Sequence, residues 1–271
     1  MNGSDLATAL RAGRRVYGTL IVSPSPRWPQ TLRGCALDFV FIDTEHIALD
    51  RAQLSWMCQA YDGLGMAPLV RIPSPDPYLA TQVLDGGAAG VIAPYVETAE
   101  QVQALCGAVK CRPIKGQRLQ RLLQGEPCQP ELDQYMRRGC AGNVLVVNIE
   151  STPAMAALDA ILAVPGLDAV LIGPHDLSCS LGIPEQYAHP RFLEAVRTIF
   201  RQARSAGVGA GIHFWGPLEQ AADLLRDGAN FLIHSSDIGL FTQGLTRDLA
   251  WLRRTVDAVD PESPSPTTFQ V

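Results

Sequence analysis

Short, continuously apolar runs recur along the chain and alternate with stretches in which apolar residues repeat at helical spacing. There are eight such runs: Val16–Val22, Phe39–Ile42, Ala67–Ile72, Gly90–Ala93, Val144–Ile149, Ala169–Ile172, Val208–His213 and Phe231–His234. Continuous apolar runs that are rich in Val, Ile and Leu are typical of parallel strands buried on both faces. The pattern therefore predicts eight buried strands that alternate with helices.

Helix start signals between these runs support the alternation. Two of them have the spacing of a capping box, Asp50 with Gln53 and Thr98 with Gln101. The third is Thr152, a predicted N-cap that is followed by Pro153 in the first helical turn. An eightfold alternation predicts an α/β fold of the (β/α)8 TIM-barrel type. A doubly wound sheet has the same local order, but it needs a glycine-rich turn after the first strand, and the cluster Gly207–Gly211 instead leads into a strand.

Length and composition fit one barrel. The chain has 271 residues, 47% hydrophobic and 18% charged, whereas a TIM barrel typically needs about 250 residues. A Pro- and Ser-rich segment at the end breaks the otherwise even composition. We therefore predict a single barrel domain over residues 1–260 and a disordered tail over residues 261–271.

Charge, hydropathy and cysteine usage exclude several classes of partner. The formal net charge of −5 argues against an electrostatic grip on nucleic acid. No stretch of 18 uncharged apolar residues occurs and the N-terminus lacks a signal-peptide pattern, so no membrane association is expected. The seven cysteines include no Cys-x-x-Cys pair, which is typical of reduced thiols in a cytoplasmic protein.

The chain contains only two lysines, Lys110 and Lys115, and neither ends an apolar run. A lysine that forms an imine must be partly desolvated on a rigid element, which lowers its pKa. Covalent imine chemistry is therefore not expected.

Two carboxylates close consecutive strands. Glu150 follows the fifth apolar run and Asp176 the sixth. Because a buried carboxylate must be paired or bound to a metal, two of them at neighbouring strand ends predict a divalent cation between them. Taken singly, Asp176 could instead cap a short helix, and Glu150 could pair with an arginine.

Other polar residues follow strands whose carboxyl ends form the catalytic face of such barrels. Asp43 and His46 lie after the second run, at a spacing that lets a carboxylate orient an imidazole. Arg71 lies in the third run, where it could also be a structural ion-pair partner of Asp43. His46 could be an exposed loop residue. His213, inside the seventh run, is more typical of a core or supporting histidine than of a ligand.

Positive charge is concentrated in residues 115–121, Lys-Gly-Gln-Arg-Leu-Gln-Arg, within the long connection between the fourth and fifth strands. Such a run is usually a solvated segment. Over the mouth of a barrel it could instead bind an anionic substrate tail.

With these residues in place, the chain resembles the HpcH/HpaI family of metal-dependent, pyruvate-forming aldolases. The motifs that match, in family order, are Phe41–His46, Val70–Ile72, Ile92–Thr98, Asn148–Glu150 and Leu171–Leu177. The resemblance implies a (β/α)8 barrel that assembles as a homo-oligomer, often a hexamer, with a C-terminal helix exchanged between subunits.

The resemblance also implies roles for individual residues. Glu150 and Asp176 would bind Mg²⁺ or Mn²⁺, with Co²⁺ as a further option. Arg71 would contact the keto oxygen, and His46, oriented by Asp43, would be the acid/base histidine. The remaining substrate-binding positions would be Asn148, Gly173, Pro174, His175 and Asp176, and backbone N–H groups around residues 173–176 would hold the pyruvate carboxylate. Asn148 stands where glutamine is frequent, and His175 where a small residue is common.

The expected function is reversible cleavage of a 4-hydroxy-2-oxo acid to pyruvate, or a related 2-oxo acid, and an aldehyde through a metal-bound enolate. A metal and a fixed arginine suit this reaction because negative charge develops on the keto oxygen. Two alternatives share the same site, an oxaloacetate-type decarboxylase and a barrel that binds a 2-oxo acid without turnover.

A final amphipathic helix is predicted over Thr242–Val259. Its apolar positions follow steps of four and three: Leu245, Leu249, Leu252, Val256 and Val259. Such a stripe must be buried. The barrel could bury it as its own eighth helix, whereas the family resemblance favours docking on a neighbouring subunit.

Overall fold

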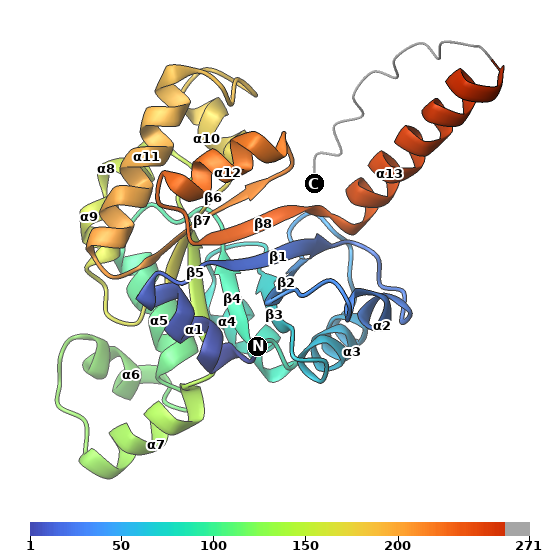
Figure 1. Cartoon of the computed structure of the whole chain (residues 1–271). Coiled ribbons are helices and arrows are strands. Elements are labelled where there is room, and N and C mark those ends of the chain that lie inside the picture. The colour runs from blue at the N-terminus through green and yellow to red at the C-terminus, as the bar shows by residue number, and fades with distance from the viewer. Residues whose placement is uncertain (258–271) are drawn as a thin grey trace.

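A computed structural model describes residues 1–257, which form a closed barrel of eight parallel strands in sequential order (Figure 1). The strands are β1 (Val16–Ile21), β2 (Phe39–Asp43), β3 (Ala67–Arg71), β4 (Gly90–Ala93), β5 (Val144–Asn148), β6 (Ala169–Ile172), β7 (Gly209–Phe214) and β8 (Phe231–Ser236). The first and last residues of each strand lie within two residues of the first and last residues of a predicted apolar run. The predicted TIM barrel is confirmed, and the doubly wound alternative is wrong.

Helices connect the strands and surround the barrel (Figure 1). They are α1 (Gly3–Ala12), α2 (Trp28–Leu32), α3 (Arg51–Asp62), α4 (Pro77–Asp85), α5 (Ala99–Lys110), α6 (Gly116–Leu123), α7 (Pro130–Cys140), α8 (Thr152–Ala156), α9 (Leu158–Leu162), α10 (Pro174–Ser180), α11 (Pro190–Ser205), α12 (Leu218–Arg226), α13 (Asp237–Leu252) and the π-helical turn η1 (Arg253–Asp257). Within residues 1–257, no helix is both long enough and apolar enough to span a bilayer.

The predicted helix starts are correct at two of three places. Complete capping boxes begin α3 and α5, formed by Asp50 with Gln53 and by Thr98 with Gln101. At α8 the N-cap is Ser151 and not Thr152, because the extended backbone of Ser151 lets its hydroxyl accept the N–H of Ala154. The proline signal is unaffected, since Pro153 still lies in the first turn.

Alternation along the strands separates the barrel interior from the layer beneath the helices. In β2, Phe39 and Phe41 belong to the interior cluster, while Val40 and Ile42 pack toward the helices. The next inward position of this strand is Asp43, and the sheet register pairs it with Arg71 of β3. A period of two thus places polar residues inside the barrel only at the carboxyl ends of the strands.

The amino-terminal end of the barrel is closed. Leu6 and Leu10 of α1 are fully buried in the interior cluster. Beside them the buried carboxylate of Asp168 accepts hydrogen bonds from Arg11 Nε at 2.8 Å and from Lys110 Nζ at 2.5 Å. Lys110 is therefore part of a structural ion pair at the closed end of the barrel. The open mouth is at the carboxyl ends of the strands.

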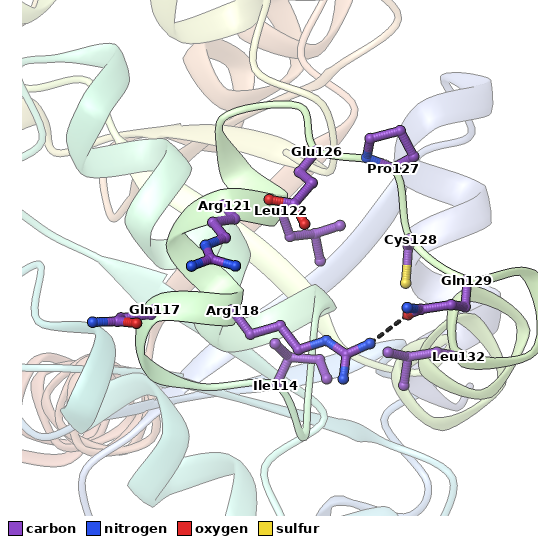
Figure 2. Close-up of a pocket in the computed structure, with 10 residues that line it drawn as sticks. All are labelled: Ile114, Gln117, Arg118, Arg121, Leu122, Glu126, Pro127, Cys128, Gln129 and Leu132. Atoms are coloured by element: carbon purple, nitrogen blue, oxygen red, sulfur yellow. Dashed lines mark hydrogen bonds between the residues drawn. The ribbon is translucent and has the colours of Figure 1, made fainter.

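The basic run at residues 115–121 lies away from that mouth. It forms most of α6, whose Leu119 and Leu123 pack against Gly107 near the end of α5. That end of α5 lies beside the starts of β5 and β6, because Lys110 also donates to the Asn143 carbonyl. A separate cavity of about 500 Å³ lies between α6 and α7. Figure 2 shows the residues that line it, with Arg118 hydrogen-bonded to Gln129. Within one chain, the placement of this run over the barrel mouth is wrong.

The last helix does not cover the barrel. Figure 1 shows α13 projecting away from it, and its side chains Leu245, Leu249 and Leu252 are 48%, 40% and 47% exposed. The alternative in which the barrel buries this stripe itself is therefore contradicted. Val256 in η1 is also exposed, while Val259 and the predicted tail at 261–271 lie outside the described residues.

Candidate active site

Arg71 and Asp43 form the best-defined polar pair at the barrel mouth. Arg71 Nε donates to Asp43 Oδ1 at 2.8 Å and Nη2 donates to Oδ2 at 2.7 Å. The guanidinium also lies over the Phe41 ring, 5.3 Å from its centroid. This bidentate pair holds the pKa of Asp43 below its usual value against the opposing effect of burial. Arg71 Nη1 has no hydrogen-bond partner among residues 1–257 and is available to a ligand.

Glu45 belongs to the same cluster; it follows the second strand, but no role was predicted for it. Its Oε2 lies 3.1 Å from Arg71 Nε, but the single N–H of that nitrogen points at Asp43. Glu45 Oε2 is consequently a buried oxygen without a hydrogen-bond donor in the described chain. Such an atom at the base of an open mouth indicates a place for a polar ligand or water.

His46 lies at the rim of the mouth and is exposed. The predicted contact between the Asp43 carboxylate and the His46 imidazole is not present, because Asp43 accepts the backbone N–H groups of Glu45 and His46 at 3.0 and 3.3 Å. The carboxylate closest to the ring is that of Glu45, whose Oε1 lies 3.8 Å from His46 Nε2. Asp43 thus orients Arg71 and the turn, while Glu45 is placed to orient the imidazole.

Glu150 lies buried two residues beyond β5, at an inward position. Its Oε1 accepts the backbone N–H of Tyr95 and its Oε2 accepts Asn148 Nδ2, both at 2.8 Å. Burial raises the pKa of Glu150, these two hydrogen bonds lower it, and the charges of Asp176 and Glu45 raise it again. A carboxylate held in this surrounding would be stabilised by a nearby cation.

Asp176 lies in the first turn of α10, and its carboxylate converges with that of Glu150 on Gly173. A Cβ at Gly173 would lie 2.8 Å from Glu150 Oε2 and 3.3 Å from Asp176 Oδ2. Asn148 Oδ1, next to Glu150, is buried and accepts no hydrogen bond from the described residues. Two converging carboxylates and a free amide oxygen are the hard oxygen donors that Mg²⁺ and Mn²⁺ prefer.

The protein supplies only part of a coordination shell. Among residues 1–257 no group of three or more His, Cys, Asp and Glu side chains is arranged to hold a metal ion. A cation between Glu150 and Asp176 would therefore take its other ligands from water and substrate. Few protein ligands with open positions are typical of a catalytic site, and they also suit Mg²⁺, which usually keeps several waters.

Gly173→Ala is expected to weaken divalent-cation binding by roughly tenfold or more, the range seen when groups that orient metal ligands are disturbed. The added methyl group would lie 2.8 Å from Glu150 Oε2 and would displace this carboxylate from the position in which Tyr95 and Asn148 hold it. Titration calorimetry with Mn²⁺ measures the effect. Gly139→Ala in α7 is the matched control, because a Cβ there meets open space; equal affinity of both variants would contradict this account.

Tyr95 is a second residue that the prediction missed. Its φ of 55° is uncommon for a residue with a side chain, and this conformation accompanies the backbone hydrogen bond to Glu150. The Glu45 carboxylate near its half-exposed phenol raises the pKa of Tyr95 to about 12. The sequence signal was its position directly after Pro94 at the end of β4, but a backbone contact leaves no pattern in side-chain types.

The predicted segment Gly173–Asp176 begins α10, with Gly173 as N-cap and buried Pro174 in the first turn. The first intrahelical bond runs from Leu177 N–H to the Gly173 carbonyl at 3.0 Å, so the N–H groups of His175 and Asp176 precede the helical ladder. The His175 ring turns to Glu185, with Nδ1 3.8 Å from the carboxylate. The backbone of this segment lies beside the carboxylate pair at Gly173, and the His175 ring lies beside Glu185.

Comparison with known proteins gives a family match that covers most of the barrel. Residues 20–243 match the family model described as HpcH/HpaI aldolase/citrate lyase. A 2-keto-3-deoxy-L-rhamnonate aldolase of Klebsiella pneumoniae subsp. pneumoniae is 32% identical over 253 residues, covering 93% of this chain and 94% of that protein. The chain therefore belongs to the HpcH/HpaI aldolase/citrate lyase family, which confirms the predicted resemblance and an enzyme of the lyase class.

Solved structures agree in fold. An HpcH/HpaI aldolase from Desulfitobacterium hafniense DCB-2 superposes with a TM-score of 0.79 at 27% identity, covering 92% of this chain and 96% of that one. The citrate synthase SbnG gives a TM-score of 0.79 at 28% identity, covering 93% and 98%. The family scaffold is thus shared by proteins named for different reactions, so the reaction has to be argued from the site.

Proposed function

We propose that this protein is a class II, divalent-metal-dependent aldolase that reversibly cleaves a 4-hydroxy-2-oxo acid into pyruvate, or a related 2-oxo acid, and an aldehyde. The observation that carries the proposal is the convergence of Glu150 and Asp176 on Gly173, at the same barrel mouth as an arginine with a free Nη1. The names of the curated relatives support a substrate derived from a sugar acid.

Glu150 and Asp176 would hold the cation, and Asn148 would fix Glu150 through its amide. When bound, a divalent cation supplies a Lewis acid that favours negative charge on the keto oxygen. The backbone of the segment Gly173–Asp176 is placed to bind the substrate carboxylate, because it forms the N-terminus of α10 beside the carboxylate pair. Together these groups would fix the 2-oxo acid end of the substrate.

Arg71 would stabilise the negative charge that develops as the carbon–carbon bond breaks. Two of its nitrogens are fixed by Asp43, so the plane of the guanidinium is set before substrate binds. Its Nη1 can then donate to the keto oxygen with no reorganisation at the moment of reaction. Asp43 acts in this scheme as a positioning residue.

His46 would move the proton of the C4 hydroxyl group. In the cleavage direction its Nδ1 accepts that proton, and the Glu45 carboxylate, 3.8 Å from Nε2, stabilises the resulting imidazolium. In the addition direction the same nitrogen returns the proton to the new hydroxyl. This assignment keeps the predicted role of His46 and gives the orienting role to Glu45.

The proposal is tested by supplying the purified protein with Mg²⁺ or Mn²⁺ and a panel of 4-hydroxy-2-oxo acids while pyruvate and aldehyde are followed together. An aldolase releases both products in equal amounts. A protein that acts on oxaloacetate and on no member of the panel is a decarboxylase, and one that binds 2-oxo acids without releasing product is a binding protein.

We also propose that the chain assembles as a homo-oligomer in which α13 docks on a neighbouring subunit, with a hexamer as the expected size. The support is the apolar stripe of α13, which one chain leaves exposed. Replacing Leu249 and Leu252 by Gln is expected to reduce the mass measured by light scattering while circular dichroism still reports a folded barrel.

Leu218→Gln is the matched control for this experiment, because Leu218 is 66% exposed but lies on α12. It is expected to leave the mass unchanged. A wild-type protein that is monomeric at assay concentration, or a double variant that keeps the wild-type mass, would contradict the docking of α13.

A further inference from the structure

His213 occupies an inward position at the mouth end of β7. Gly209 and Gly211 precede it on the same face, where a Cβ would meet Ala169 and Phe231 of the interior. The imidazole contacts Phe41 and Trp215 edge to face, with ring centroids 5.8 and 5.2 Å apart. It is partly exposed although it faces the interior. Because α1 closes the other end of the barrel, this exposure is toward the mouth.

The same ring neighbours connect His213 with the proposed catalytic centre. The His213 imidazole and the guanidinium of Arg71 both contact the Phe41 ring, with the guanidinium 5.3 Å from the ring centroid. His213 is also within the electrostatic influence of Arg71 and Asp43. The imidazole is therefore a part of the wall that a substrate held by Arg71 would meet.

The hydrogen bond of His213 fixes its tautomer. His213 Nε2 lies 3.1 Å from the carbonyl oxygen of Ser235, a residue with a φ of 51°. A carbonyl can only accept, so Nε2 carries the proton and Nδ1 has a free lone pair in the neutral ring. Among residues 1–257 no donor is hydrogen-bonded to Nδ1.

The ring stays neutral at physiological pH. Burial lowers the pKa of His213 to about 4, the hydrogen bond to Ser235 opposes this, and the positive charge of Arg71 lowers it further. The Asp43 charge raises the pKa and a charge on His234 would lower it. Nδ1 is therefore an acceptor only, which suits a hydroxyl group and excludes a carboxylate or a phosphate group.

We propose that His213 is a specificity-determining residue, whose Nδ1 accepts a hydrogen bond from a hydroxyl group on the aldehyde portion of the substrate. Trp215, whose ring adjoins the imidazole, would pack against the carbon chain of that portion. The proposal rests on the aldolase function proposed above and narrows its substrates to polyhydroxylated 2-oxo acids. The oxo-acid end is held by other residues, so His213 acts on the choice of aldehyde.

The test measures aldol addition of pyruvate to 2-hydroxypropanal and to propanal, which differ in one hydroxyl group, and compares kcat/KM for the two. The amide of glutamine can keep the Nε2 hydrogen bond to Ser235 but provides no acceptor at the Nδ1 position, whereas asparagine provides the acceptor and loses that bond. In His213→Gln the preference for the hydroxylated aldehyde is expected to fall roughly fivefold to tenfold, the value of one hydrogen bond. His213→Asn is expected to stay closer to the wild-type preference.

His234→Gln is the matched control, because His234 lies on the neighbouring strand directly after Ile233, which faces the barrel interior, and so points toward the helix layer. An unchanged preference in His213→Gln, or an equal loss on both aldehydes, would overturn the specificity proposal. If the wild type adds pyruvate to neither aldehyde but forms pyruvate from other 4-hydroxy-2-oxo acids, the specificity proposal fails and the aldolase function stands. If it shows no pyruvate chemistry at all, the aldolase function fails as well.

Discussion

Glu150→Gln and Asp176→Asn are each expected to abolish detectable pyruvate formation without unfolding the barrel. In Glu150→Gln the side-chain amide still offers an oxygen to the Tyr95 N–H, so the hydrogen bond that holds this position is retained in part. What is lost is one of the two negative charges that would bind the cation. The measurements are turnover on a 4-hydroxy-2-oxo acid and the rise in Tm on addition of Mn²⁺, which reports cation binding by linkage.

The control is Asp62→Asn, which removes the same charge from an exposed position at the end of α3. It is expected to keep both activity and the Mn²⁺-dependent rise in Tm. If Glu150→Gln keeps both readouts as well, these carboxylates are structural and the proposed metal centre is wrong.

Arg71→Lys is expected to lower kcat by about 10² to 10³, the usual cost of removing one donor to a developing oxyanion. Lysine keeps the positive charge against buried Asp43, so the protein is expected to fold. Its ammonium group is a compact point charge and cannot bind Asp43 with two nitrogens while a third faces the substrate. Steady-state kinetics with a saturating 4-hydroxy-2-oxo acid measures the effect.

Arg197→Lys is the matched control, since Arg197 pairs with Asp227 at 2.9 Å on the outside of the barrel. His46→Ala gives a second comparison, because water at the exposed rim can take over proton transfer, and its loss in kcat is expected to be smaller than that of Arg71→Lys. Near-normal turnover of Arg71→Lys would make Arg71 a structural partner of Asp43 only.

The sequence predicted the barrel and most of the site because both follow from one-dimensional patterns. The eight apolar runs fix the strands, and a period of two then places Asp43, Arg71 and Glu150 at inward positions near the strand ends. Asp176 follows because it lies just beyond the sixth strand, where α10 begins.

Three features could not be predicted, each for a physical reason. In the turn Asp43–His46 either carboxylate could approach the imidazole, and only the bidentate pairing of Asp43 with Arg71 leaves Glu45 to do so. The charge of residues 115–121 does not say which end of the barrel they occupy; the packing of α6 on α5 decides this. The stripe of α13 predicts burial, but amphipathic spacing carries no information about which surface covers it.

The most direct test of the central claim is to assay the metal-stripped protein with a cleavable 4-hydroxy-2-oxo acid, and to repeat the assay after Mg²⁺ or Mn²⁺ is restored. Pyruvate, aldehyde and residual metal content are measured in the same samples. The account predicts no product from the stripped protein and equimolar pyruvate and aldehyde after reconstitution. Full activity with verified zero metal, or pyruvate formed without aldehyde, would contradict it.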